Sequence, residues 1–69
     1  PRAAFPDGHP ELATGLGNLA TVLLRRNRFA DAADLFAELA DVRARLLGAD
    51  HPQTVGTVES LGLARYRQG

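Results

Sequence analysis

Residues 48–52 read Gly-Ala-Asp-His-Pro, and residues 6–10 carry a related stretch, Pro-Asp-Gly-His-Pro. The His-Pro pair recurs at an offset of 42 residues, and apolar positions farther along keep this offset, as at Leu16 and Val58. Self-similarity at a fixed period of roughly 20–50 residues is typical of repeat proteins, in which each repeat is one supersecondary unit. The sequence therefore predicts one full repeat with parts of two others beside it.

The first helix of this repeat is expected over residues 10–26. Proline suits the first turn at Pro10, and Asn27 can take the left-handed conformation that ends a helix. The apolar spacing follows the period of an amphipathic helix. The predicted core face consists of Leu12, Leu16, Leu19, Ala20 and Leu23.

The second helix is expected over residues 29–47 and should end before Gly48. Its wide apolar stripe suits a helix that packs against neighbours on two sides. That stripe consists of Phe29, Ala32, Leu35, Phe36, Leu39, Ala40, Val42, Leu46 and Leu47. We expect Phe36 to lie between the first two helices, and Asp41 to pair with Arg45 at i, i+4.

The third helix is expected over residues 52–68, with a core face formed by Val55, Val58, Leu61 and Gly62. A glycine inside a helix lowers its stability by about 1 kcal/mol relative to alanine. Gly62 is expected to compensate by letting a neighbouring helix approach closely. Because histidine recurs at the junction, we interpret His51 as a connector that caps this helix.

Composition and charge exclude several classes of function. Eight basic and eight acidic residues cancel, so the chain lacks the basic excess of a dedicated nucleic-acid-binding domain. There is no cysteine, which excludes disulfides, a thiol nucleophile and thiolate metal ligands. No apolar run approaches the roughly 18 residues of a membrane span, and no signal peptide is visible. We therefore expect a cytoplasmic protein without membrane contact.

Catalytic and metal-binding chemistry has few candidate residues. His9 and His51 recur with the repeat, and no third ligand stands at a tetrahedral spacing, so no metal or other cofactor is expected. The hydroxyls of Thr14, Thr21 and Ser60 share no helical face with a histidine. The sequence therefore predicts that the chain is not an enzyme.

The repeat resembles the tetratricopeptide repeat, a helix–turn–helix unit with the pattern Trp-x2-Leu-Gly-x2-Tyr followed by Ala-x3-Phe. The corresponding positions are Leu16, Leu19, Ala20, Leu23, Ala32 and Phe36, with leucines in place of the two aromatic residues of the first helix. The resemblance implies an all-α fold of antiparallel helix–turn–helix repeats, an α-solenoid, of which this chain carries about three helices.

The junction and the offset are similar to those of the kinesin light chain subtype, in which Gly-Pro-Asp-His-Pro joins the units. The subtype's Leu-Asn-Asn-Leu-Ala corresponds to residues 16–20, Leu-Gly-Asn-Leu-Ala, where Gly17 replaces one asparagine. Its Gly-Arg-Tyr-x-x-Ala turn corresponds to residues 27–32, Asn-Arg-Phe-Ala-Asp-Ala. The resemblance extends over residues 5–69 and implies that residues 1–69 are one segment excised from a longer array.

The resemblance also implies a concave groove that binds a protein or peptide. In this family an asparagine at the position of Asn18 hydrogen-bonds the main chain of a ligand, because its amide both donates and accepts. Helical spacing places other side chains on or beside the same face. The expected groove residues are Asn18, Thr14, Thr21, Arg25 and Leu24 from the first helix, and Ser60, Leu63 and Arg67 from the third.

Together these features predict a protein–protein or protein–peptide interaction scaffold within a larger regulatory or adaptor protein. One alternative is a structural spacer or oligomerisation element without a groove ligand. The other is a helical nucleic-acid-binding domain, in which Arg25, Arg26 and Arg28 would contact phosphates; we interpret this cluster instead as a complement to the helix dipole. Incomplete cover of Val58 and Leu61 also predicts self-association.

Overall fold

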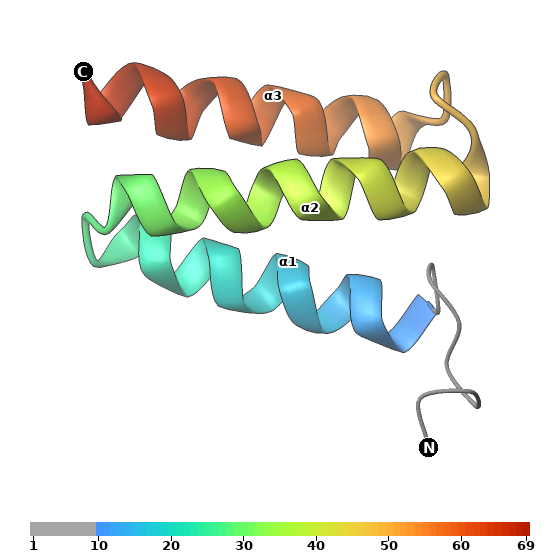
Figure 1. The fold of residues 1–69 in the computed structure, drawn as a ribbon, viewed down its shortest axis with the longest axis horizontal. Coiled ribbons are helices and arrows are strands. Elements are labelled where there is room, and N and C mark those ends of the chain that lie inside the picture. Colours follow the sequence, from blue (N-terminus) through green and yellow to red (C-terminus); the bar gives the residue numbers. More distant parts are fainter. Residues whose placement is uncertain (1–9) are drawn as a thin grey trace.

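The computed structural model describes residues 10–69, and the side chains of residues 12–69. Within this range there are three helices and no strand: α1 (Pro10–Arg25), α2 (Phe29–Leu47) and α3 (Pro52–Gln68). They run antiparallel with α2 in the middle, in a layer whose shortest extent is 13 Å (Figure 1). The expected all-α, helix–turn–helix architecture is confirmed. The expectations for residues 5–9, including His9, lie outside the described residues.

The turn between α1 and α2 is set by the backbone of Asn27. This residue has a φ of 63°, as its place at the helix end predicts. The N–H of Arg28 donates to the carbonyl of Leu23 at 2.9 Å, and the N–H of Asn27 donates to that of Leu24 at 3.1 Å. These two bonds form the Schellman pattern, which satisfies carbonyls at a helix end. The chain can therefore reverse direction within three residues.

The junction between α2 and α3 uses a different set of local bonds. Gly48 has a φ of 100°, a conformation that side chains disfavour, and it ends α2. His51 caps α3, because its Nδ1 accepts a hydrogen bond from the N–H of Gln53 at 3.1 Å. The hydroxyl of Thr54 donates to the carbonyl of Gly48 at 2.8 Å and ties the first turn of α3 to the end of α2. The expected capping role of His51 is confirmed.

One aromatic ring and several alanines form the centre of the core. Phe36 is buried in α2, and it clusters with Ala20 of α1 and Ala64 of α3, both fully buried. Two more alanines of α2, Ala32 and Ala33, complete the cluster. Because alanines present little bulk, both outer helices can approach α2 closely around this ring. Phe36 thus contacts both interfaces, whereas the sequence predicted only the one with α1.

A second core cluster fixes the other half of the α1–α2 interface. It consists of Ala13, Leu39 and Val42, with Leu16 packed against it. The predicted core face of α1 is therefore partly wrong: Leu12 and Leu19 are 45% and 51% exposed. Ala20 faces α2 as predicted, and Ala13 faces it in place of Leu12, because these small residues permit the close approach. At the end of α2, Leu46 and Leu47 are also exposed, which corrects the C-terminal part of its predicted stripe.

The buried face of α3 also differs from the prediction. Thr54, Thr57 and Ala64 are buried, whereas Val55 and Val58 are 44% and 52% exposed. The threonines can be buried because each hydroxyl donates to a backbone carbonyl. The role expected for Gly62 is not observed, because no described atom lies within 4 Å of the position that a Cβ would occupy there. A hydrophobicity pattern undervalues such hydrogen-bonded threonines.

Candidate functional site

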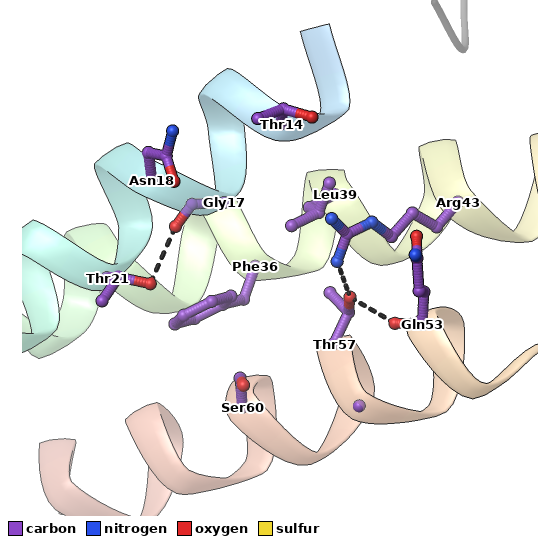
Figure 2. A pocket seen from close by; sticks show the side chains of 11 residues that line it. Thr14, Gly17, Asn18, Thr21, Phe36, Leu39, Arg43, Gln53, Thr57 and Ser60 are labelled. Carbon is purple, nitrogen blue, oxygen red and sulfur yellow. Dashed lines mark hydrogen bonds between the residues drawn. The ribbon is translucent and has the colours of Figure 1, made fainter. Parts of the chain in front are cut away.

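A pocket of about 380 Å3 lies between α1 and α3 and has α2 as its floor (Figure 2). Thr14, Asn18 and Thr21 line it from α1, and Gln53, Thr57 and Ser60 line it from α3. The remaining lining residues are Gly17, Phe36, Leu39, Arg43 and Gly56. The walls are thus mainly polar, whereas two buried apolar side chains of α2 lie beneath them. We call this pocket the groove.

The structure brings together four of the eight predicted site residues. Thr14, Asn18, Thr21 and Ser60 all line the groove, and they face it from both sides (Figure 2). The other four residues do not line it. Arg25, Leu63 and Arg67 are exposed elsewhere on their helices, and Leu24 is partly buried against the core cluster of Phe36. Leu24, which was expected among the groove residues, therefore packs against the core and does not line the groove.

Three polar groove residues were not predicted from the sequence: Arg43, Gln53 and Thr57. Arg43 belongs to α2, whereas the family resemblance directs attention to the first helix of each repeat. The sequence does indicate where Arg43 lies, because Phe36, Leu39 and Arg43 stand at i, i+3 and i+7 and therefore share one helical face. Once that face is known to be the floor, Arg43 must project into the groove.

The guanidinium of Arg43 is held by a directional hydrogen bond to α3. Its Nη1 donates to the hydroxyl oxygen of Thr57 at 2.8 Å, and that hydroxyl donates in turn to the carbonyl of Gln53 at 2.8 Å. Because the buried hydroxyl of Thr57 donates its proton to the carbonyl of Gln53, the lone pairs of its oxygen are oriented toward the guanidinium. Across the groove, a Cβ placed on Gly17 would lie 4.0 Å from Nη2 of Arg43. The guanidinium therefore spans the groove from α3 toward α1.

The side chains of the groove walls differ in whether they form hydrogen bonds within the protein. The hydroxyl of Thr21 donates to the carbonyl of Gly17 at 2.8 Å, within its own helix. Asn18 is exposed, and the structure gives its amide no hydrogen bond to another described residue. An amide of this kind offers both a donor and an acceptor to a ligand.

An apolar recess of about 190 Å3 adjoins the groove. It shares Thr14, Arg43 and Gln53 with the groove, and it is otherwise lined by Ala13, Leu46 and Leu47. The recess explains the exposure of the two leucines at the end of α2, which the sequence assigned to the core. Arg43 thus stands where a polar groove meets an apolar surface.

Two of the arginines outside the groove form local ion pairs. Arg45 pairs with Asp41 at 2.8 Å, as its spacing predicts, and Arg28 pairs with Asp31 at 2.9 Å. Of the described residues that line the groove, Arg43 is the only charged one. Residues 12–69 hold no group of three side chains that could ligate a metal ion. None of the three helices combines the length and the apolar character that crossing a bilayer requires.

The comparison with protein families agrees with this architecture. No curated protein and no solved structure matches the chain significantly. The family model described as "Tetratricopeptide repeat" matches residues 12–53, more than half of the chain, including most of α1, all of α2 and the junction to α3. Repeats of this family are protein-interaction modules and are generally not catalytic. The two helices, the tight turn at Asn27 and the family match lead to one conclusion: the chain belongs to the tetratricopeptide repeat family.

Proposed function

We propose that the groove binds an extended peptide segment of a partner protein. The observation that supports this proposal is the arrangement of the groove, a pocket of about 380 Å3 in which polar side chains face each other above an apolar floor. An extended peptide exposes main-chain N–H and C=O groups, which need partners when they leave water. Asn18 from α1, and Gln53 and Ser60 from α3, offer such partners on both sides.

We also propose that the chain belongs to a particular subtype of the family and forms part of a larger protein. We infer a 42-residue period and a kinesin-light-chain-like subtype, with the groove continuing along an array in a regulatory or adaptor protein. The backbone supports this period, because Asn27 and Gly69, 42 positions apart, both have a positive φ at a helix end, 63° and 95°. His51 supports it as well, because it caps α3 from the junction that defines the period.

A pair of substitutions tests the groove. Peptides that bind the unmodified chain would first be selected from a random peptide library, and their affinities measured by titration calorimetry. Asn18→Ala should weaken binding by roughly 5- to 150-fold, the equivalent of about 1–3 kcal/mol for a peptide group left without its partner. Its melting temperature should hardly change, because Asn18 is exposed.

Leu39→Ala provides the opposite control. This leucine is 1% exposed, so its truncation should destabilise the fold by roughly 2–5 kcal/mol through a core cavity. Unchanged affinity in Asn18→Ala, or a loss of stability in that variant equal to that of Leu39→Ala, would contradict the peptide groove.

A second candidate function is oligomerisation without a groove ligand. It is favoured by the exposed apolar side chains on the outer faces of α1 and α3, among them Leu19 and Val58. If this is the function, the chain should associate with itself and should bind no peptide from the library. Sedimentation of the chain with and without selected peptides separates the two candidates.

A further inference from the structure

His51 holds the first turn of α3 through an atom that can take up a proton. Its Nδ1 accepts the N–H of Gln53 at 3.1 Å. An imidazole accepts a hydrogen bond only through a ring nitrogen that carries no proton, so the cap requires the neutral ring with its proton on Nε2. Imidazoles titrate near about pH 6.5, where carboxylates and arginines keep their charge. The cap can therefore be lost under conditions that leave most other charges of the chain unchanged.

A continuous series of hydrogen bonds leads from this cap to the floor of the groove. The carbonyl of Gln53 accepts the hydroxyl of Thr57 at 2.8 Å, and the oxygen of that hydroxyl accepts Nη1 of Arg43 at 2.8 Å (Figure 2). The backbone of Gln53 is thus bonded on both sides, its N–H to His51 and its C=O to Thr57. Gln53, Thr57 and Arg43 all line the groove. Loss of the cap therefore acts on a residue that belongs to the groove wall.

The surroundings of His51 give an added proton little compensation. The charged residues of the joined elements are Asp41, Arg43 and Arg45 near the end of α2, Asp50 in the junction, and Glu59 in α3. Asp50 is exposed, so water screens its charge. Among the described residues, His51 has no ion-pair partner. A positive charge at the N-terminus of a helix also opposes the helix dipole.

The other bonds of the junction do not depend on the protonation of the ring. The carbonyl of Gly48 accepts the N–H of His51 at 3.2 Å and the hydroxyl of Thr54 at 2.8 Å. These bonds keep α3 attached to α2 when the cap is lost, so the change stays local to the first turn of α3. The turn between α1 and α2 is an internal reference, because the bonds of Asn27 and Arg28 there join backbone groups.

We propose that His51 makes the junction between α2 and α3 sensitive to pH. A proton from water adds to Nδ1 and turns this acceptor into a donor, so the N–H of Gln53 loses its partner and the first turn of α3 loosens. The stabilisation by the cap is present where the ring is neutral, and it is lost as the pH falls through the range in which imidazole titrates. Because Gln53 and Thr57 form part of the groove wall, a ligand in the groove would bind more weakly at acidic pH. This last step rests on the proposed function, whereas the change at the junction does not.

The test compares two chains that differ only at position 51. His9 is the other histidine of the sequence. The first chain carries His9→Asn, so that His51 is its single histidine, and the second carries His9→Asn together with His51→Asn. Between about pH 7.5 and about pH 5.5, the melting temperature of the first chain should fall by roughly 4–8 °C, as expected for a lost N-cap in a domain of this size. The second chain should show no such fall, because an asparagine cap does not titrate in this range.

Nuclear magnetic resonance locates the change. At neutral pH, the ring nitrogens of His51 should show the tautomer with the proton on Nε2. As the pH falls, the backbone amide signals of Gln53 and Thr57 should move with the same midpoint as the ring of His51. The amide signal of Asn27 should stay in place, because the bonds of its turn involve no ring nitrogen.

The outcomes separate this inference from the proposed function. An equal fall in melting temperature for the two chains, or no fall in either, would overturn the inference, and so would a proton on Nδ1 at neutral pH. Calorimetric titration with a library-selected peptide at both pH values tests the link to the groove, where the chain with single His51 should bind several-fold more weakly at the lower pH. Equal affinity at both would overturn that link alone. If no peptide binds at all, the peptide groove is wrong, but melting and magnetic resonance still decide the role of His51.

Discussion

Arg43 in α2 and Thr57 in α3 are joined through their side chains, with Nη1 of the arginine 2.8 Å from the threonine hydroxyl. The threonine is buried, and its hydroxyl also donates to the carbonyl of Gln53. The link therefore connects the floor of the groove to one of its walls and sets how far α3 stands from the arginine.

Removal of this link should lower stability by a measurable amount. Thr57→Val keeps the side-chain volume but removes the acceptor, and the lost hydrogen bond should cost about 1 kcal/mol, because Arg43 is only partly buried and water can replace it in part. Urea unfolding of Thr57→Val, Arg43→Met and the double variant forms a double-mutant cycle. A coupling energy near zero would show that the two side chains do not stabilise each other.

The core ring of Phe36 should be the most sensitive apolar position. Phe36 is 5% exposed and clusters with alanines from all three helices, so its truncation should leave a cavity at the centre of the core. Phe36→Ala should cost roughly 3–5 kcal/mol, enough to unfold a domain this small. Circular dichroism and thermal melting provide the measurement.

Leu19→Ala is the control for this prediction, because Leu19 is 51% exposed and its truncation should cost less than about 1 kcal/mol. The sequence alone would have placed Leu19 in the core and predicted a cavity there. Equal destabilisation by the two substitutions would contradict the observed orientation of α1.

The three-helix fold was predictable because local residues set the limits of each helix. Asn27 and Gly48 take positive φ values that a continuing helix does not allow, and Pro52 opens a helix behind its cap. These constraints act within a few residues, and therefore they can be recognised from the sequence. The orientation of each helix about its axis is different, because it depends on the helix that packs against it.

The candidate site was predictable only in part for the same reason. Asn18 follows from the family resemblance, and Thr14 and Thr21 follow from it through the helical period of α1. To predict Arg43 as a groove residue, one must know which face of α2 lies between the walls. To predict Gln53, one must know the angle between α2 and α3. Leu24 was misplaced because alanines, and not leucines, mark the closest helix contacts, so the core face lies farther around α1 than the leucines suggest.

The cap of α3 gives a prediction that is independent of the core. His51 accepts the N–H of Gln53 through Nδ1, so His51→Ala leaves that donor without its side-chain partner. The expected cost is about 0.5–2 kcal/mol, the usual range for a lost N-cap. His51→Asn supplies another acceptor of suitable length and should recover most of the stability. If both variants melt at the same temperature as the unmodified chain, the cap contributes nothing to stability.

The two outer faces of the helical layer should make the chain associate. Leu12, Leu19 and Val22 of α1 are each more than 40% exposed, and so are Val55 and Val58 on α3. Apolar side chains grouped on one face commonly mark an interaction surface, because their contact with another such surface removes them from water. Sedimentation equilibrium should therefore show an average mass that rises with concentration.

Single charges on each face would locate this association. Val58→Lys and Leu19→Lys should each shift the chain toward the monomer, because a lysine buried in an apolar contact would leave its charge without water or a partner. Gln68→Lys adds the same charge at an exposed site near the end of α3 and serves as the matched control. If only Val58→Lys restores the monomer, the contact is formed by α3 alone, and if both variants do so, both faces take part. A chain that remains monomeric up to high concentration would show that these apolar side chains are too dispersed to form an interface.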